Sequence, residues 1–224
     1  MRRCIVACKA IEEEFRRILP PGVELRGLEQ GLHRAPEKLR ESLQREIDSI
    51  AADEILLGYG NCGNGVVGLK SETARLVVPR VDDCIAILLG SYERYKREFE
   101  REPGTYWLSH GWIEHSEDPL KEYERVKAKW DEETAQWVAH ETMKGYHRMA
   151  LISTWACPLD QLRGYANRFA EFFNLDYQEM EGTGDLFHAL LRYEERAGDG
   201  FVVVEPGEEI TAEMFLPTVG LPNG

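Results

Sequence analysis

The chain alternates short apolar runs with stretches of helical periodicity, and this alternation restricts its fold more than any other feature. Runs such as CIVA, EILLG and LVVP are too short for helices and are bounded by turn residues, which is typical of buried strands. Elsewhere apolar residues recur at helical spacing, as at Leu39, Leu43 and Ile47. This pattern predicts an α/β fold with a mostly parallel sheet flanked by helices.

The expected elements follow one another through most of the chain. Pro36 suits the first turn of one helix, and Asp82 or Asp83 suits the cap of another. The expected strands cover residues 3–7, 23–28, 54–59, 76–79, part of 103–112, 149–154, 175–180 and 201–204. The expected helices cover residues 11–19, 36–50, 82–99, 159–173 and 185–192.

The pattern is interrupted in the middle of the chain, which divides it into three parts. Residues 119–145 are highly charged and predict one or two amphipathic helices without a strand. Residues 1–118 then form an amino-terminal α/β half, and residues 146–224 form a carboxy-terminal one. Both halves share a β-α-β-α-β order. This order indicates either two similar Rossmann-like halves with a cleft between them or a chance likeness of two α/β segments.

Charge and hydropathy exclude two classes of partner. The formal net charge of -13 opposes sequence-independent binding of nucleic acid, which needs Lys and Arg to neutralise phosphates. No apolar run approaches the roughly 18 residues of a membrane span. The amino-terminal apolar stretch runs directly into an acidic helix, unlike a signal peptide. We therefore expect a cytoplasmic protein whose five cysteines stay reduced.

Three cysteines and one histidine follow expected strands at their carboxyl ends. They are Cys8, His33, Cys62 and Cys84. In an open parallel sheet these ends line one edge, where ligands bind. Thiolates and imidazoles are ligands that zinc prefers, so the sequence predicts a zinc site with these four residues as candidate ligands. The alternative is that the cysteines pack as small apolar residues and that the histidine packs beside the following helix.

The glycine-rich segment GYGNCGNGVVG is the strongest local signal. It joins a strand to an expected helix, whose free N–H groups favour an anion and lower the pKa of a nearby thiol such as Cys62. The segment matches neither the GxxxxGK[ST] phosphate loop nor a GxGxxG motif in register. We expect substrate contacts from Tyr59, Gly63, Asn64 and Gly65. A structural turn with an incidental cysteine is the alternative.

The segment PRVDDCI places further polar groups where a strand meets a helix. In a functional interpretation Arg80 binds an anionic group, and Asp83 orients the substrate or accepts a proton. In a structural interpretation an aspartate only caps the helix, and the adjacent cysteine is buried. Trp112, together with Tyr106 and Trp107, is expected to shape the pocket, although aromatic side chains near a sheet edge are also ordinary core residues.

Taken together, these segments resemble one known family. IVACKAIEEE, GLHRAPEKLRESL, ILLGYGNCGNGVVGL, LVVPRVDDCIAILLGS, PGTYWLSHGW and GFVVVEPG are similar to segments of the bacterial and archaeal DUF1638 proteins, over almost the full length. The family segments contain Cys8, His33, Cys62, Asp83 and Cys84. Many members carry His where this chain has Asp82, which argues against a ligand role there. Members are often encoded near corrinoid-dependent methyltransferases, which implies a role in methyl or one-carbon metabolism.

We therefore expect a zinc-dependent enzyme that acts on a small molecule in methyl or one-carbon metabolism, with methyl transfer favoured over hydrolysis. The alternative is a non-catalytic carrier that delivers a metal or a corrinoid to a methyltransferase or corrinoid protein. No DxHxxG turn for base-off corrinoid binding is present. A substrate cleft at the cysteines would favour the enzyme, and a surface site without a pocket would favour the carrier. A third hypothesis is a structural partner protein whose cysteines only pack in the core.

Overall fold

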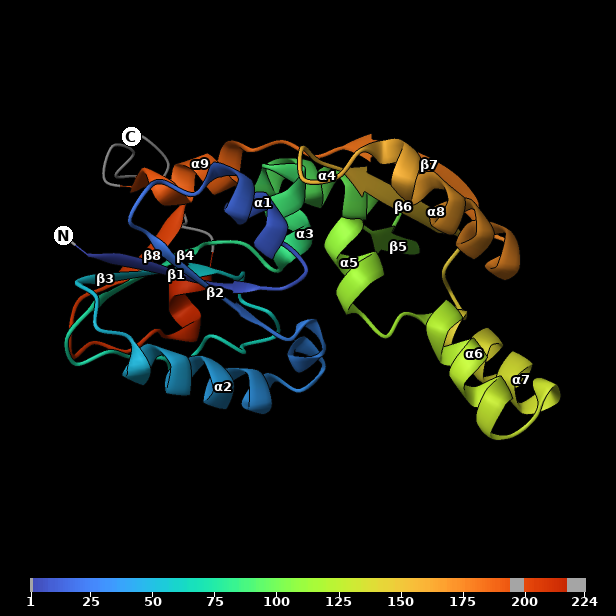
Figure 1. Cartoon of the computed structure of the whole chain (residues 1–224), viewed down its shortest axis with the longest axis horizontal. Coiled ribbons are helices and arrows are strands. Elements are labelled where there is room, and N and C mark those ends of the chain that lie inside the picture. Colours follow the sequence, from blue (N-terminus) through green and yellow to red (C-terminus); the bar gives the residue numbers. More distant parts are fainter. Residues whose placement is uncertain (1, 194–199, 217–224) are drawn as a thin grey trace, which may run out of the picture.

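The computed structural model describes residues 2–193 and 200–216, and it has the expected α/β architecture with two sheets in two lobes (Figure 1). The sheet of the first lobe has the strand order β2-β1-β3-β4-β8, and the sheet of the second lobe has the order β5-β6-β7. The first sheet consists of β1 (Arg3–Cys8), β2 (Glu24–Leu28), β3 (Glu54–Gly58), β4 (Arg75–Pro79) and β8 (Phe201–Val204). The second consists of β5 (Thr105–Leu108), β6 (Arg148–Ser153) and β7 (Asp176–Glu181).

Helices cover both faces of the first sheet. Helix α2 (Pro36–Ser49) lies on one face, and α1 (Glu12–Ile18), α3 (Cys84–Leu89) and α9 (Asp185–Leu191) lie on the other (Figure 1). Short elements connect the layers: the 3-10 helices η1 (Gln30–Arg34) and η3 (Ala212–Phe215), and the helices α4 (Tyr92–Arg101) and α5 (His110–His115). This layered arrangement explains why β1, β3 and β4 are apolar after their first residue.

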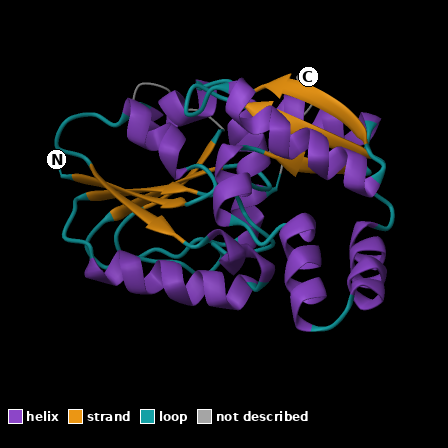
Figure 2. Cartoon of the chain, turned by 45° about the vertical axis from the view of Figure 1, so that its right-hand side comes forward, coloured by secondary structure: helices purple, strands orange, loops and turns teal. Residues whose placement is uncertain are grey.

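The second lobe carries a helix on its sheet and a projecting helical hairpin. Helix α8 (Leu159–Phe173) packs on β6 and β7. Helices α6 (Pro119–Lys129) and α7 (Glu132–Met143) pack against each other and extend away from both sheets (Figure 2). They occupy the segment that the sequence assigned to a helical excursion.

The core of the first lobe follows from the two periodicities of the sequence. Every residue of β3 is buried, and β1 is buried from its second residue onwards. On α2, Leu39, Leu43 and Ile47 are buried and form one stripe toward the sheet, while Pro36 occupies the first turn. Strands β1 to β4 pair in parallel, so their carboxyl ends share one edge.

Two expected helices differ from the structure for reasons of backbone geometry. The helix expected over 82–99 is two helices, because Gly90 has a φ of 78° and ends α3. No helix follows the glycine-rich segment, where residues 62–68 form turns. Cys62, Gly63 and Asn64 all have positive φ, with values of 48°, 65° and 71°, and such a run is incompatible with a right-handed helix.

The two sheets are interleaved in sequence and do not divide at residue 118. Strand β5 lies within the expected amino-terminal half, yet it pairs with β6 in the second sheet. Strand β8 lies within the expected carboxy-terminal half, yet it returns to the first sheet and pairs antiparallel with β4. In the carboxy-terminal half, the third strand of the apparent repeat, β8, therefore lies in a different sheet from the first two, β6 and β7. In the amino-terminal half all three strands, β1, β2 and β3, lie in one sheet, so the topology does not repeat.

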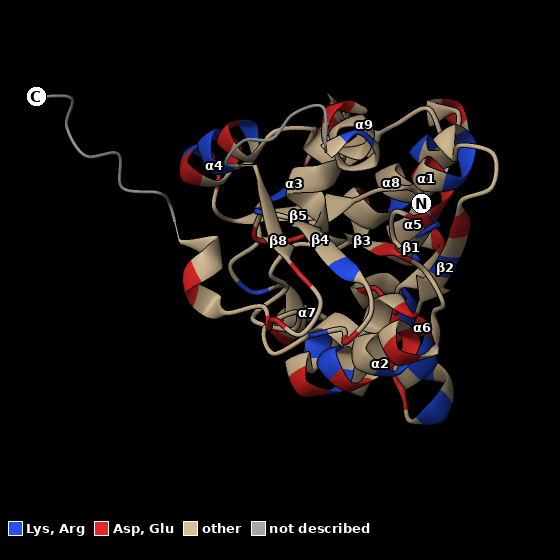
Figure 3. Ribbon diagram, turned by 90° about the vertical axis from the view of Figure 1, so that its left-hand side faces the viewer, with Lys and Arg blue, Asp and Glu red and all other residues tan. Residues whose placement is uncertain are grey.

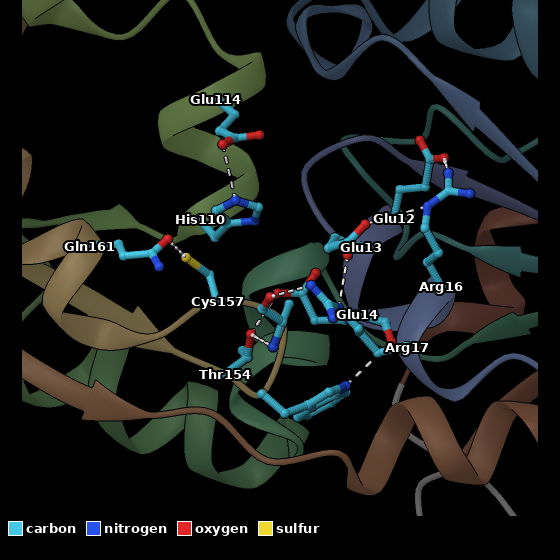
Figure 4. Close-up of polar contacts among 12 residues, drawn as sticks. Glu12, Glu13, Glu14, Arg16, Arg17, His110, Glu114, Thr154, Cys157 and Gln161 are labelled. Atoms are coloured by element: carbon cyan, nitrogen blue, oxygen red, sulfur yellow. Dashed lines mark hydrogen bonds and ion pairs between the residues drawn. The ribbon is translucent and has the colours of Figure 1, made fainter.

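Polar contacts join α1 to the segment that follows β6 in the second lobe (Figure 4). The Thr154 hydroxyl donates to Glu14 Oε1 at 2.7 Å, and the guanidinium of Arg17 donates to the Ala156 carbonyl at 3.4 Å. Glu14 is only 1% exposed, although glutamate side chains are usually charged at neutral pH. These contacts fix the position of the second lobe against the first.

Charged residues lie mainly on the outer helices, with both signs interspersed along α2 and α4 (Figure 3). The strands of the first sheet carry few of them in the same view. Among the described helices, none has both the length and the apolar character needed to cross a lipid bilayer.

Candidate functional site

A pocket of about 450 Å³ lies at the carboxyl ends of the parallel strands of the first sheet. Its volume is within the range of small-molecule sites, about 300–1,000 Å³. Most of the residues singled out by the sequence line it: Cys8, His33, Tyr59, Cys62, Gly63, Asp83, Cys84 and Trp112. Tyr106 and Trp107 from β5 line it as well, so both lobes contribute to its wall.

Strand register brings the first of these residues to the pocket. Cys8 is the last residue of β1 and lies opposite Leu28 of β2, while Ala7 lies opposite Gly58 of β3. The three strands β1, β2 and β3 therefore end at the same level of the sheet. The segments that follow β2 and β3 supply His33 and the glycine-rich loop, as expected for the edge of a parallel sheet.

Backbone hydrogen bonds then hold the glycine-rich loop against the start of α3. The N–H of Cys62 donates to the carbonyl of Asp82, and the N–H of Asn61 donates to the carbonyl of Val81, both at 2.8 Å. Cys84 is the first residue of α3. These two bonds therefore place the Cys62 and Cys84 thiols on the wall of one pocket.

Two backbone features allow this close approach. A Cβ on Gly60 would lie 2.6 Å from the backbone nitrogen of Asp83 and 2.7 Å from the carbonyl oxygen of Val81, so only glycine fits there. Cys62 itself has a φ of 48°, a left-handed conformation that is unfavourable for a residue with a side chain. Such strain is concentrated at functional sites, where the surrounding structure enforces it.

Trp112 reaches the pocket because α5 packs closely on the turn after β1. A Cβ on Gly111 would lie 2.2 Å from the carbonyl oxygen of Ala10, so glycine permits the contact. The Trp112 ring lies 5.5 Å from the His33 ring, measured between centroids. Its indole N–H is buried without a hydrogen-bond partner among the described residues, and Trp112 lowers the pKa of the Cys84 thiol by less than burial raises it.

All three thiols of the pocket have raised pKa values. Burial raises the pKa of Cys8 to about 11. Burial, then the charges of Asp83 and Cys8, raise the pKa of Cys62 to about 12. Burial, then the charges of Cys8, Asp83 and Cys62, raise the pKa of Cys84 well above its usual range. The expected lowering at Cys62 is wrong because the thiol itself is withdrawn from water and no helix follows the turn.

Two of these effects come from neighbouring thiols: Cys8 raises the pKa of Cys62, and Cys8 and Cys62 raise the pKa of Cys84. A thiolate at Cys8 therefore makes ionisation at the other two positions harder. A bound cation reverses this conflict, because it favours the deprotonated form of every thiol at once. Within the described residues, however, no three His, Cys, Asp or Glu side chains have the arrangement of a metal site. Metal binding would therefore require the thiols to rotate inward.

One ring nitrogen of His33, Nε2, has no hydrogen-bond partner within residues 2–193 and 200–216. Its Nδ1 lies 2.6 Å from the carbonyl oxygen of Gln30, and because a carbonyl can only accept, Nδ1 carries the proton and donates. The Nε2 lone pair is then left for a proton or a metal. Metal-binding histidines are commonly oriented by such a bond to a backbone carbonyl.

Asp83 caps the amino-terminal end of α3, as the structural interpretation of the sequence predicted. Its Oδ1 accepts from the N–H of Ile85 at 2.9 Å and of Ala86 at 3.4 Å, and its Oδ2 accepts from the Tyr95 hydroxyl at 3.2 Å. Burial raises its pKa against the effect of these bonds. Asp83 lines the pocket, but both of its oxygens already have partners.

Three candidate residues lie away from the pocket. Arg80 donates to the carbonyl of Phe201 in β8, at 3.5 Å, and does not line the pocket. Asn64 is exposed, and the N–H of Gly65 is used within the turn, where it donates to the carbonyl of Cys62 at 3.2 Å. These groups therefore form no anion site at the pocket in the described structure.

The pocket also contains residues that the sequence did not single out. Gln30 and Tyr146 line it, the former from η1 and the latter from the segment before β6. The ring of Tyr146 packs edge-on against Tyr106, with centroids 5.4 Å apart. Gln30 follows the same strand as His33, so the strand-end argument applied to it equally. Tyr146 had no comparable signal, because its approach depends on the position of the second lobe.

The chain belongs to the family described as "Protein of unknown function (DUF1638)", whose model matches residues 27–191. This confirms the resemblance found in the sequence. The matched range includes His33, Cys62 and Cys84, whereas Cys8 precedes it. No curated protein and no solved structure matches the chain.

Proposed function

We propose that Cys8, Cys62 and Cys84 bind a soft metal ion, zinc in the first instance, and that the protein is an enzyme acting on a small molecule in the adjoining pocket. The observation that carries this proposal is the meeting of three thiols from three separate elements at one pocket. Three thiolates satisfy most of a tetrahedral zinc site, and His33 or a substrate atom would take the fourth position.

The electrostatics of the pocket support a cation. Cys8 raises the pKa of Cys62, and both raise the pKa of Cys84, and a divalent ion would relieve this opposition between neighbouring thiolates. The strained backbone at Cys62 points the same way, because a simple packing role does not require a cysteine with positive φ. The proposal requires the cysteine side chains to change rotamer, which each can do by rotation about its Cα–Cβ bond.

The pocket favours an enzyme over a carrier. A cavity of about 450 Å³ beside the thiols has room for a small substrate as well as an ion. A protein that delivers a metal or a corrinoid to a methyltransferase would need its site at an exposed surface. The carrier therefore remains the alternative, with less support.

Within this proposal, methyl transfer is the favoured reaction. Zinc with thiolate ligands activates a bound thiol or water by acting as a Lewis acid, and an activated thiol is a methyl acceptor. None of the described lining residues is Lys or Arg, and aromatic side chains form much of the wall. Such a wall suits an apolar methylated group better than a phosphate ester. Hydrolysis, with an activated water, is the alternative.

Elemental analysis tests the metal directly. Protein purified without oxygen should contain about one equivalent of zinc, iron, nickel or cobalt by mass spectrometry, a stoichiometry expected for one tetrahedral site. Cys62→Ser and Cys84→Ser should lose it while keeping their circular dichroism. Cys4→Ser and Cys157→Ser are matched controls, since neither cysteine lines the pocket, and both should retain the metal. Equal metal content in all four variants, or none in the wild type, would refute the proposal.

A further inference from the structure

Gln30 is a buried polar side chain without a protein partner. It is 1% exposed, and neither its Nε2 nor its Oε1 has a hydrogen-bond partner among the described residues. Tyr59 is 2% exposed, and its hydroxyl likewise has no hydrogen-bond partner among the described residues. Both residues line the pocket of the three thiols. The indole N–H of Trp112, which also lines the pocket, is a third such group. Since roughly nine in ten buried polar groups in proteins are hydrogen-bonded, three residues with unpartnered groups in one pocket indicate a ligand.

The chemistry of Gln30 specifies the complementary group. A glutamine amide presents a donor and an acceptor side by side. A carboxamide or the edge of a lactam presents the same pair in reverse order and can form two parallel hydrogen bonds with it. The Tyr59 hydroxyl, which can both donate and accept, could form a third hydrogen bond, to the oxygen or to the nitrogen of the ligand's amide.

The charges around the pocket favour a neutral ligand. No Lys or Arg is present among its described lining residues. Of the three carboxylates that line it, Glu29 is paired with Lys9, Asp83 caps α3, and Asp82 is exposed at the rim. The described lining residues therefore offer no cation to an anionic ligand and no buried, unpartnered carboxylate to a cationic one, and burying such a group unpaired is costly.

We propose that the substrate of this pocket is an uncharged planar amide, either a carboxamide or a lactam, held by Gln30 and Tyr59 between aromatic side chains. Trp112, Trp107 and Tyr106 supply the flat apolar walls. The ligand's role as substrate rests on the function proposed above, whereas its binding through Gln30 does not require the metal.

Three probes of the same shape test the charge and the hydrogen-bond pattern. Benzamide is neutral and presents a donor and an acceptor, benzoate is an anion with two acceptors, and benzamidinium is a cation with donors only. In a ligand-observed NMR titration we expect benzamide to bind at least tenfold more tightly than the other two, in zinc-loaded and in chelator-treated protein alike. Equal or tighter binding of benzoate or benzamidinium, or no binding of benzamide, would overturn the proposal.

Variants separate recognition from folding. Gln30→Leu should weaken benzamide binding at least tenfold without lowering Tm, because it removes a buried amide that has no protein partner. Tyr59→Phe should show the same combination. Gln44→Leu is the matched control: Gln44 donates to Asp48 and to the carbonyl of Lys70, so this change should lower Tm and leave benzamide binding unchanged. A lower Tm for both Gln30→Leu and Tyr59→Phe, with unchanged binding, would assign both residues to the fold.

The two proposals fail in different ways. Benzamide binding that depends on Gln30 in a protein without a metal site would sustain this inference and refute the metal. Retention of the metal by Gln30→Leu, together with equal benzamide affinity in that variant and the wild type, would refute this inference and leave the metal site intact.

Discussion

The backbone N–H of Cys62 donates to the carbonyl oxygen of Asp82 across 2.8 Å, and this bond links the glycine-rich loop to the start of α3. Asp82 is two residues before Cys84, so the bond brings two thiols from separate strand ends to the same pocket wall. The pocket therefore depends on how closely two backbone segments can approach, and less on any single side-chain contact.

Gly60→Ala tests this approach directly. The new methyl group would lie 2.6 Å from the backbone nitrogen of Asp83, so the loop and the start of α3 must separate. We expect a loss of about 1–3 kcal/mol in the free energy of unfolding, measured in urea, as for other overpacked sites. We also expect loss of bound metal, measured by elemental analysis. Full metal content in this variant would show that the thiols do not need the contact.

Gly164→Ala is the matched control for glycine replacement. Gly164 lies in α8, and a Cβ there would meet no atom within 4 Å. Because alanine favours a helix more than glycine does, we expect this variant to gain about 0.5–1 kcal/mol in the free energy of unfolding. Its metal content should equal that of the wild type.

Cys62→Gly separates backbone strain from thiol chemistry. Glycine adopts a φ of 48° without a side-chain penalty, whereas Cys62→Ser keeps the penalty. In metal-free protein we therefore expect Cys62→Gly to be more stable than Cys62→Ser by about 1 kcal/mol, measured in urea. Both variants should fail to bind metal. Equal stability of the two would mean that the loop imposes no strain on Cys62.

That Cys8, Cys62 and Cys84 line one pocket could be predicted because it depends on local and general rules. Short apolar runs identified β1, β3 and β4, and parallel pairing places their carboxyl ends at one edge. The sequence also offered the capping role of Asp83 as an alternative, from the preference of aspartate for helix starts.

Features that depend on contacts between distant segments could not be predicted in this way. The sequence contains no local signal that β5 joins the second sheet or that β8 returns to pair with β4. The strand-end argument places Gln30 near the edge of the sheet but does not predict its burial, because a glutamine is normally exposed and α5 packs against η1 from a distant part of the chain. The error at Cys62 arose from an expected helix that the positive φ values prevent.

Gly111→Ala tests the contact that brings Trp112 to the pocket. An added Cβ would lie 2.2 Å from the carbonyl oxygen of Ala10, so α5 must move away from the turn after β1. We expect a loss of about 1–3 kcal/mol in the free energy of unfolding, measured in urea. Trp112 should also become more accessible to acrylamide quenching, compared in a Trp112→Phe background. Unchanged quenching would show that α5 holds its position by other contacts.

Glu14 should make the stability of the protein depend on pH. Burial raises the pKa of its carboxyl, and the hydrogen bond from Thr154 lowers it by less. The folded state therefore binds more protons than the unfolded state above the ordinary value of 4.5. The contribution of this group to stability is full below that pH and is lost as the pH rises through the raised pKa.

Glu14→Gln removes the charge and keeps an oxygen that can accept from Thr154 (Figure 4). We expect its Tm to exceed that of the wild type at pH 7, because Oε2 of the native carboxylate is buried without a hydrogen bond in the described structure. The difference should shrink toward pH 4, where the native carboxyl is protonated. Glu13→Gln is the matched control on the same helix: it removes surface ion pairs to Arg16 and Arg17 and should cost at most about 1 kcal/mol. A lower Tm for Glu14→Gln at pH 7 would mean that the charge of Glu14 is stabilised at the junction of the two lobes, where the charge of His110 lowers its pKa.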